Sequence, residues 1–297
     1  MKKILYLSYF FVLPAFAAFA WSGCGREAEL LSVGSSQEIQ PLTKNTAAPG
    51  LQVTPVFRMP TGKNGQRLTV FVFYEKGGNG GGGGKKPPKD DGGGEVCSDP
   101  NTNKAFSELG VRWAQTGIWV DYQPAFEPDA VTGMAYGAID RAFGAWESAA
   151  GNGSLVEFVE DASAPLPPAS DGRNVVGWRQ LVGRDSRKVL AATYIWDVDG
   201  MISEVDIVYN TAHKWAVNEA ILDGSTTCGK DFDVQAIGVH EIGHLLGLGH
   251  VYDDGVMENG DETDATMAPT AAKGELKKQT LTPGDMAGVK AVLQLAI

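Results

Sequence analysis

The sequence of 297 residues predicts an α+β protein with several short strands and a few helices. One observation is a series of short runs rich in β-branched and aromatic residues, which are typical of strands. Another is the stretch 131–148, whose apolar residues recur at helical spacing. A third is the histidine-bearing stretch 239–250, which has the same spacing and carries the chemistry discussed below.

The chain is acidic, with a formal net charge of −11, and it shows no basic cluster with interleaved aromatic residues. Both features argue against a nucleic-acid-binding protein. With 43% hydrophobic and 21% charged residues, the composition is that of an ordinary globular protein. We therefore expect no nucleic-acid partner, and we expect a monomer.

Residues 1–23 are predicted to be a signal peptide, because Lys2 and Lys3 precede an apolar run from residue 4 to residue 20. Two processing sites are open. Cleavage after Ala20 fits an ordinary signal peptidase, whereas the residues that end at Cys24 resemble a bacterial lipobox. We therefore expect a protein that is secreted or lipid-anchored on the bacterial cell surface or outer membrane. Its only membrane contact would be the anchor at Cys24.

The cysteine count favours lipidation of Cys24, because this leaves Cys97 and Cys228 as an even pair. Because an exported pair of this kind can form a disulfide, we predict a disulfide between Cys97 and Cys228. Cleavage after Ala20 would instead leave three thiols in the mature chain. Intact mass would distinguish these predictions.

The first third of the chain divides into a tether, a hairpin and a linker. Residues 24–50 are polar and predict an unstructured tether. Residues 51–76 predict a β-hairpin that turns at Asn64 and Gly65, and that serves as an accessory module or as a pro-segment. A lone hairpin is marginal in water, so it must pack on another part of the protein. Residues 77–96 are rich in glycine and predict a flexible linker.

Residues 97–297 predict the main domain, with its elements in the following order. The pattern gives a strand at 111–122, a helix at 131–148 with Met134 on its apolar face, and strands at 155–159, 174–178, 189–196 and 202–209. The next helix begins near Asp233, a suitable N-cap. In the last helix, Thr282 and Asp285 form a capping-box-like pair around Pro283.

The stretch "VHEIGHLLGLGH" concentrates three of the four histidines of the chain. His240 and His244 lie about 40° apart on one helix face, and Glu241 is displaced by about 100°. Gly247 can end the helix in the left-handed conformation, so that His250 returns to the same place. Three imidazoles and one water form the open tetrahedral site of catalytic zinc. Glu241 can then reach the bound water without ligating the metal.

A buried helix with satisfied histidines is the alternative explanation of this stretch. A chance occurrence of the full pattern has an expectation of about 10⁻⁴ in a chain of this length. In addition, Gly243, Gly247 and Gly249 would weaken a purely structural helix. The pattern therefore indicates a metal site.

The motif His240-Glu241-x-x-His244-x-x-Gly247-x-x-His250, followed by Met267, resembles that of the metzincin metallopeptidases. Within this clan the chain is most similar to the matrixins, whose Met-turn resembles "ATMAP". The segments "ISEVDIVYN" and "LTPGDMAGVKAVL" are also matrixin-like, and the similarity covers residues 104–297.

The resemblance implies a metzincin fold. This consists of a twisted five-stranded mixed sheet, two long helices, and a small C-terminal subdomain with the Met-turn and a last helix. It also implies one catalytic Zn²⁺ and the hydrolysis of peptide bonds in extracellular proteins or peptides. Glu241 would be the general base and then the proton donor. An edge strand would pair with extended substrate, and its residues would be Ala191, Ala192, Thr193 and Tyr194. The loop 269–282 would form the specificity wall.

The sequence also departs from animal matrixins. It lacks their cysteine-switch motif, so the latency mechanism is open, and Cys97 could instead cap the zinc. Only His213 lies outside the motif, so a second zinc site with three histidines cannot form. Ca²⁺ could bind a carboxylate cluster, although ordinary turn roles explain the same residues. The cluster consists of Asp197, Asp199, Glu204 and Asp206, with the loop 253–264 as a second candidate.

The competing function is a non-catalytic surface lipoprotein that keeps the metal for structure. Glu241 argues against it, because a structural site has no need for a carboxylate that binds no metal.

Overall fold

The computed structural model describes residues 57–60, 65–76, 103–151, 155–183, 186–218, 229–251 and 265–294. The predicted signal peptide, tether and linker lie outside these residues. So do Cys24, Cys97 and Cys228, and the acidic loop 253–264.

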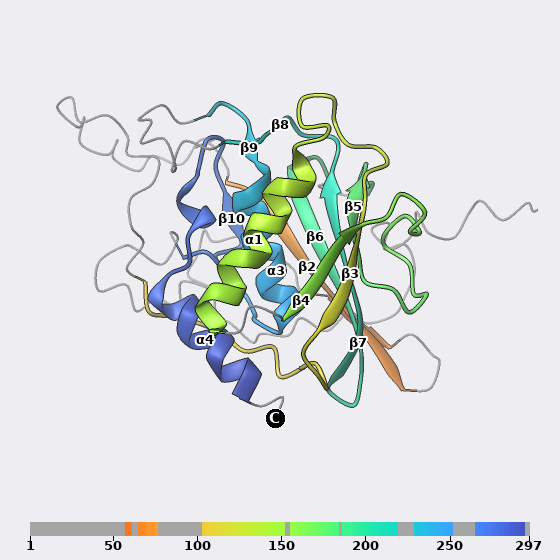
Figure 1. Cartoon of the computed structure of the whole chain (residues 1–297), viewed down its shortest axis with the longest axis vertical. Coiled ribbons are helices and arrows are strands. Elements are labelled where there is room, and N and C mark those ends of the chain that lie inside the picture. Colours follow the sequence, from red (N-terminus) through yellow and green to blue (C-terminus); the bar gives the residue numbers. More distant parts are fainter. Residues whose placement is uncertain are drawn as a thin grey trace, which may run out of the picture.

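A large mixed sheet forms one layer of the molecule, and helices cover one of its faces (Figure 1). The strand order is β1-β2-β6-β7-β5-β3-β4, and β10 also pairs with β2. The strands are β1 (Phe57–Pro60), β2 (Gln66–Glu75), β3 (Ile118–Gln123), β4 (Val156–Glu160), β5 (Val175–Arg179), β6 (Val189–Val198), β7 (Met201–Asn210) and β10 (Thr270–Ala271). A separate pair consists of β8 (Trp215–Ala216) and β9 (Phe232–Asp233).

The α+β class is confirmed, but the prediction of a five-stranded sheet is wrong. Strands β4, β3, β5, β7 and β6 are the five expected ones, and β2, β1 and β10 extend the sheet beyond β6. β2 joins because both of its faces are apolar and become buried from Leu68 to Phe73. The hairpin thus packs on the main domain, as a marginal two-stranded unit must.

Strand β3 is shorter than its predicted range of 111–122. It begins at Ile118, after Gly117 with a φ of 76°, a conformation that interrupts an extended strand. Before this point, Arg112 forms only an isolated bridge with Met201.

Two long helices, α1 (Ala135–Ala150) and α3 (Val234–Leu246), pack against each other over the sheet (Figure 1). Their approach is close, because a Cβ at Gly238 would lie 3.2 Å from Ala142 Cβ and 2.8 Å from Tyr209 Oη. The indole Nε1 of Trp146 also donates a 2.8 Å hydrogen bond to Val239 O. Met134, expected on the buried face of α1, is instead half exposed, because it precedes the first helical turn.

The last helix, α4 (Pro283–Gln294), begins with the predicted capping pair. Asp285 N donates to Thr282 Oγ1 (3.0 Å), and Thr282 N donates to Asp285 Oδ2 (2.8 Å). The short 3₁₀ turns η2 (Ser186–Lys188) and η4 (Lys277–Gln279) complete the described elements. Within the described chain, no helix has the length and apolar character needed to cross a bilayer.

Candidate active site

Helix α3 carries the first two histidines, and the ends of the helix are fixed locally. At its start, Asp233 Oδ1 accepts the N–H of Ala236 at 2.7 Å. At its end, Gly247 has a φ of 107°, and a Cβ there would lie 2.9 Å from Val111 O. Both facts require glycine at this turn. The turn redirects the chain, so that His250 faces the helix.

The three motif histidines form one cluster, and their ligand atoms lie within 4.8 Å of one another. His240 Nδ1 lies 2.8 Å from Thr266 O, and His244 Nδ1 lies 2.8 Å from Leu248 O. Because a carbonyl oxygen only accepts hydrogen bonds, both Nδ1 atoms carry the proton. The Nε2 atoms are then the free donors for a metal, and those of His240 and His244 lie 3.1 Å apart.

Burial keeps the three imidazoles neutral. It lowers the pKa of His244 to about 3, and it lowers the pKa of His240 and His250 well below the ordinary value. Metal binding requires neutral imidazoles. Three neutral nitrogen donors that converge on one point are the protein ligands of a catalytic zinc site with an open fourth position.

Glu241 lies fully buried beside this cluster. Thr193 Oγ1 donates a hydrogen bond to Glu241 Oε2, whereas Glu241 Oε1 has no hydrogen-bond partner among the described residues. Burial raises the pKa of Glu241 to about 8, and the hydrogen bond from Thr193 partly opposes this. A buried carboxylate oxygen without a donor is costly. A water at the open metal position would supply that donor, so the residues fit a catalytic zinc centre.

Met267 packs directly against the motif helix. A Cβ at Gly243 would lie 2.4 Å from Met267 Sδ and 2.9 Å from Trp146 Cζ2, so only glycine leaves room for the Met-turn here. Val251 N donates to Met267 O at 3.0 Å, which links the Met-turn to the segment just after His250. The buried Lys278 Nζ donates to Ala265 O in the same turn.

The residues predicted for the edge strand lie in β6, but β6 is not an edge. Its one side pairs with β7, and its other side pairs antiparallel with β2, where substrate was expected. Ala191, Ala192, Thr193 and Tyr194 are all buried. The sequence predicted β2 as a strand of the hairpin but not its pairing with β6, because the apolar pattern of a strand does not indicate which edge it will join.

Two aromatic residues of β2 contact the histidines and were not predicted. Phe71 stacks on His244 with ring centroids 4.1 Å apart, and it meets His250 edge-on at 5.2 Å. Phe73 stacks on His240 at 4.0 Å. The alternation in "TVFVFY" indicates a buried strand, but it carries no information about these partners. Thr193 was expected only as a backbone partner of substrate.

The four acidic residues considered for calcium have separate partners. Asp197 pairs with Arg67, and Glu204 Oε1 and Oε2 accept the N–H groups of Asp171 and Gly172 at 3.0 and 2.9 Å. Asp206 accepts from Ala169 N and Val175 N at 2.9 and 2.8 Å. Asp199 occupies the turn after β6 with a φ of 50°. Among the described residues, only the three histidines form a group that could hold a metal.

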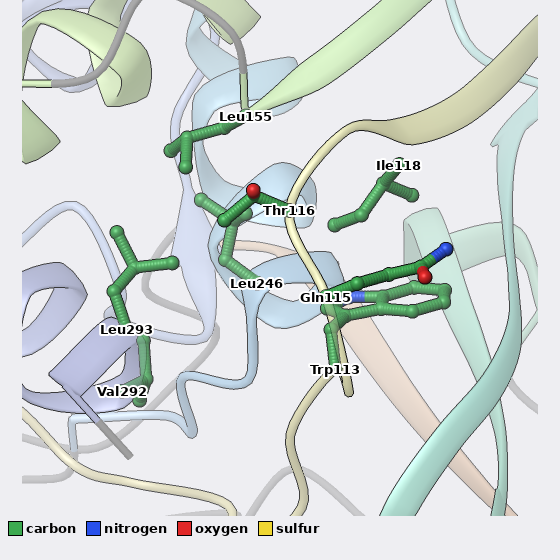
Figure 2. A pocket seen from close by; sticks show the side chains of 8 residues that line it. All are labelled: Trp113, Gln115, Thr116, Ile118, Leu155, Leu246, Val292 and Leu293. Atoms are coloured by element: carbon green, nitrogen blue, oxygen red, sulfur yellow. The ribbon is translucent and has the colours of Figure 1, made fainter. Parts of the chain in front are cut away.

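His213 lies away from the histidine cluster, half-buried and edge-on to Phe232 at 5.4 Å. A small hollow near the end of α3 is lined by Trp113, Leu155, Leu246 and Leu293, among others (Figure 2). None of its eight lining residues is ionisable. Neither feature adds chemistry to the site.

The comparison with protein families agrees with this geometry. The family model described as Matrixin matches residues 126–294, which is more than half of the chain and includes all three histidines, Glu241 and Met267. No curated protein matches the sequence. Matrixins are metalloendopeptidases that use catalytic zinc and cleave protein substrates. The chain therefore belongs to the matrixin family of zinc metalloendopeptidases.

Proposed function

We propose that this chain hydrolyses peptide bonds in extracellular proteins, with Glu241 as the general base. The observation that carries the proposal is the position of Glu241, which is buried beside three convergent imidazoles with Oε1 unpartnered among the described residues. When bound, zinc would activate a water molecule and polarise the scissile carbonyl.

The residues of the chain supply the proton transfers. Glu241 Oε1 takes a proton from the attacking water, and the same oxygen then delivers it to the nitrogen of the leaving amine. Thr193 holds the other carboxylate oxygen through its hydroxyl. The carbonyl groups of Thr266 and Leu248 keep His240 and His244 in the tautomer whose unprotonated Nε2 would bind the metal. Thr193 therefore acts as a positioning residue.

The test compares the full zinc-loaded chain with Glu241→Gln on a mixed peptide library. We expect equal zinc content and a loss of about 10²-fold or more in kcat/KM for the variant. Phe71 and Phe73 cover the histidines. The native chain and Glu241→Gln are therefore each measured a second time with the substitutions Phe71→Ser and Phe73→Ser added. If all forms hold zinc and none cleaves peptides, the alternative of a non-catalytic lipoprotein with a structural metal replaces this proposal.

We also propose that the protein is exported, as a secreted or a lipid-anchored form. Lys2, Lys3 and the apolar run 4–20 support export, and the cysteine count supports an anchor at Cys24. The mass of the mature protein tests both statements. A chain that begins at a lipidated Cys24 would support the anchor, a chain that begins at Trp21 would support secretion, and an unprocessed chain would contradict export.

A further inference from the structure

The strand β2 occupies the side of β6 that an extended substrate would use. β2 pairs antiparallel with β6 from Gln66↔Val198 to Tyr74↔Val189, over almost its whole length. On its other side, β2 pairs in parallel with β10, which follows the Met-turn directly. Tyr74 N donates to Pro269 O at 3.0 Å, and Lys76 N donates to Ala271 O at 2.7 Å. The chain's own segment therefore lies between the two backbones that line the groove.

The side chains of β2 also close the metal site. Phe71 and Phe73 point to the same face of the sheet, because they are two residues apart, and their rings stack on His244 and His240. Both phenylalanines are at most 2% exposed, and Glu241 is 0% exposed. With β2 in place, a substrate can neither pair with β6 nor reach Glu241.

From these contacts we infer that β2 is a built-in occupant of the substrate groove and keeps the enzyme latent until it leaves. The inference rests on the proposed peptidase function of the same site. This form of latency would need no cysteine-switch motif, which the chain lacks.

The same contacts define a class of substrate. The groove accepts an extended segment that adds a strand to β6. In this groove Phe71 stacks on one histidine ring and Phe73 stacks on another. A substrate with aromatic residues two positions apart could make the same two contacts. The alternating residues Val70 and Val72 face the other side of the sheet, where they pack with Tyr194 and Trp196. We therefore expect cleavage of apolar, aromatic-rich extended segments.

The first experiment compares the full zinc-loaded chain with Phe71→Ser/Phe73→Ser. We expect the variant to release zinc to a colorimetric chelator about tenfold faster or more, because opening of the site no longer requires breaking two ring stacks. Peptidase activity should rise by a similar factor. Cleavage of the chain within β2 upon zinc loading would support the same placement, because the strand would then be the first substrate.

A matched peptide experiment tests the groove directly. A synthetic peptide of residues 66–76 should inhibit the double variant competitively. Replacing its Phe71 and Phe73 by serine should weaken inhibition about tenfold or more, whereas replacing Val70 and Val72 by threonine should have a smaller effect. If the double variant does not fold, Tyr74→Pro takes its place, since proline lacks the N–H that bonds Pro269 O.

The outcomes separate the two proposals. Equal zinc release and equal activity in the native chain and the variant would overturn the latency inference. Faster zinc release without any peptide cleavage would support the closing role of β2 and contradict the peptidase function. A rise in activity that Glu241→Gln abolishes in the double variant would support both.

Discussion

The hydroxyl of Thr193 in β6 donates a hydrogen bond to the carboxylate of Glu241 in α3, inside a site that solvent does not reach. The two residues are 48 positions apart in sequence, and the bond joins the sheet to the motif helix. It fixes one carboxylate oxygen and leaves the other free of protein donors among the described residues. The proposed base thus has a defined orientation before any ligand arrives.

Thr193→Val should lower kcat by about tenfold and leave zinc content unchanged, because the hydroxyl orients Glu241 without touching the metal ligands. The bond also lowers the pKa of Glu241, so its loss should shift the acidic limb of the kcat/KM profile to higher pH. Kinetics over a pH series would measure both effects. Thr193→Ser should restore the profile, and a valine variant with an unshifted profile would argue that Thr193 is only structural.

In the metal-free protein, the stabilisation contributed by the protonated carboxyl of Glu241 should decrease as pH rises from about 5 to 8. Burial raises the pKa of Glu241 in the folded state from 4.5 to about 8, so the folded state binds its proton more tightly than the unfolded state. The resulting contribution of Glu241 to the free energy of unfolding is fully present below pH 4.5 and is lost as pH rises through about 8. Glu241→Gln resembles the protonated form. From pH 5 to pH 8 the metal-free variant should gain roughly 3–4 kcal/mol of unfolding free energy relative to the native protein. Melting curves at pH 5 and pH 8 would check this, and equal pH dependence of the two proteins would contradict it.

Gly243→Ala should destabilise the protein by about 1–3 kcal/mol, because the new Cβ would overlap Met267 Sδ and Trp146 Cζ2. It should also reduce activity, since Gly243 precedes His244. Gly144→Ala in α1 is the matched control. No atom lies within 4 Å of a Cβ at that position, and alanine should stabilise the helix by up to about 1 kcal/mol. Denaturant unfolding would compare the two variants, and equal stability would refute the packing role of Gly243.

Asp233→Ala should cost about 2 kcal/mol of unfolding free energy. Its carboxylate caps α3 through Ala236 N, and it also accepts hydrogen bonds from Gln279 Nε2 at 2.8 Å and Asn218 Nδ2 at 3.0 Å. The change therefore leaves buried donors unsatisfied. Asp233→Asn keeps one acceptor oxygen, so its unfolding free energy should fall by less than that of the alanine variant. Calorimetric melting would rank the three proteins, and an alanine variant as stable as native would contradict the prediction.

The sequence by itself determined which histidines form the cluster and where the helices end, because these depend on residues close together in the chain. Two histidines four positions apart share a helix face, and Gly247 provides the turn that returns His250. Asp233, Thr282 and Asp285 cap their helices through backbone atoms within three residues. The positions of strands β4 to β7 also follow from local alternation.

Only the tertiary structure decided which strand lies beside β6 and which side chains cover the histidines. A strand with two apolar faces can pair with any free edge, and the choice depends on contacts between residues more than 100 positions apart. For the same reason, no sequence pattern indicated that Phe71 and Phe73 stack on His244 and His240, or that Thr193 holds Glu241. The chemistry of the site is local in sequence, whereas its closure arises from long-range strand pairing.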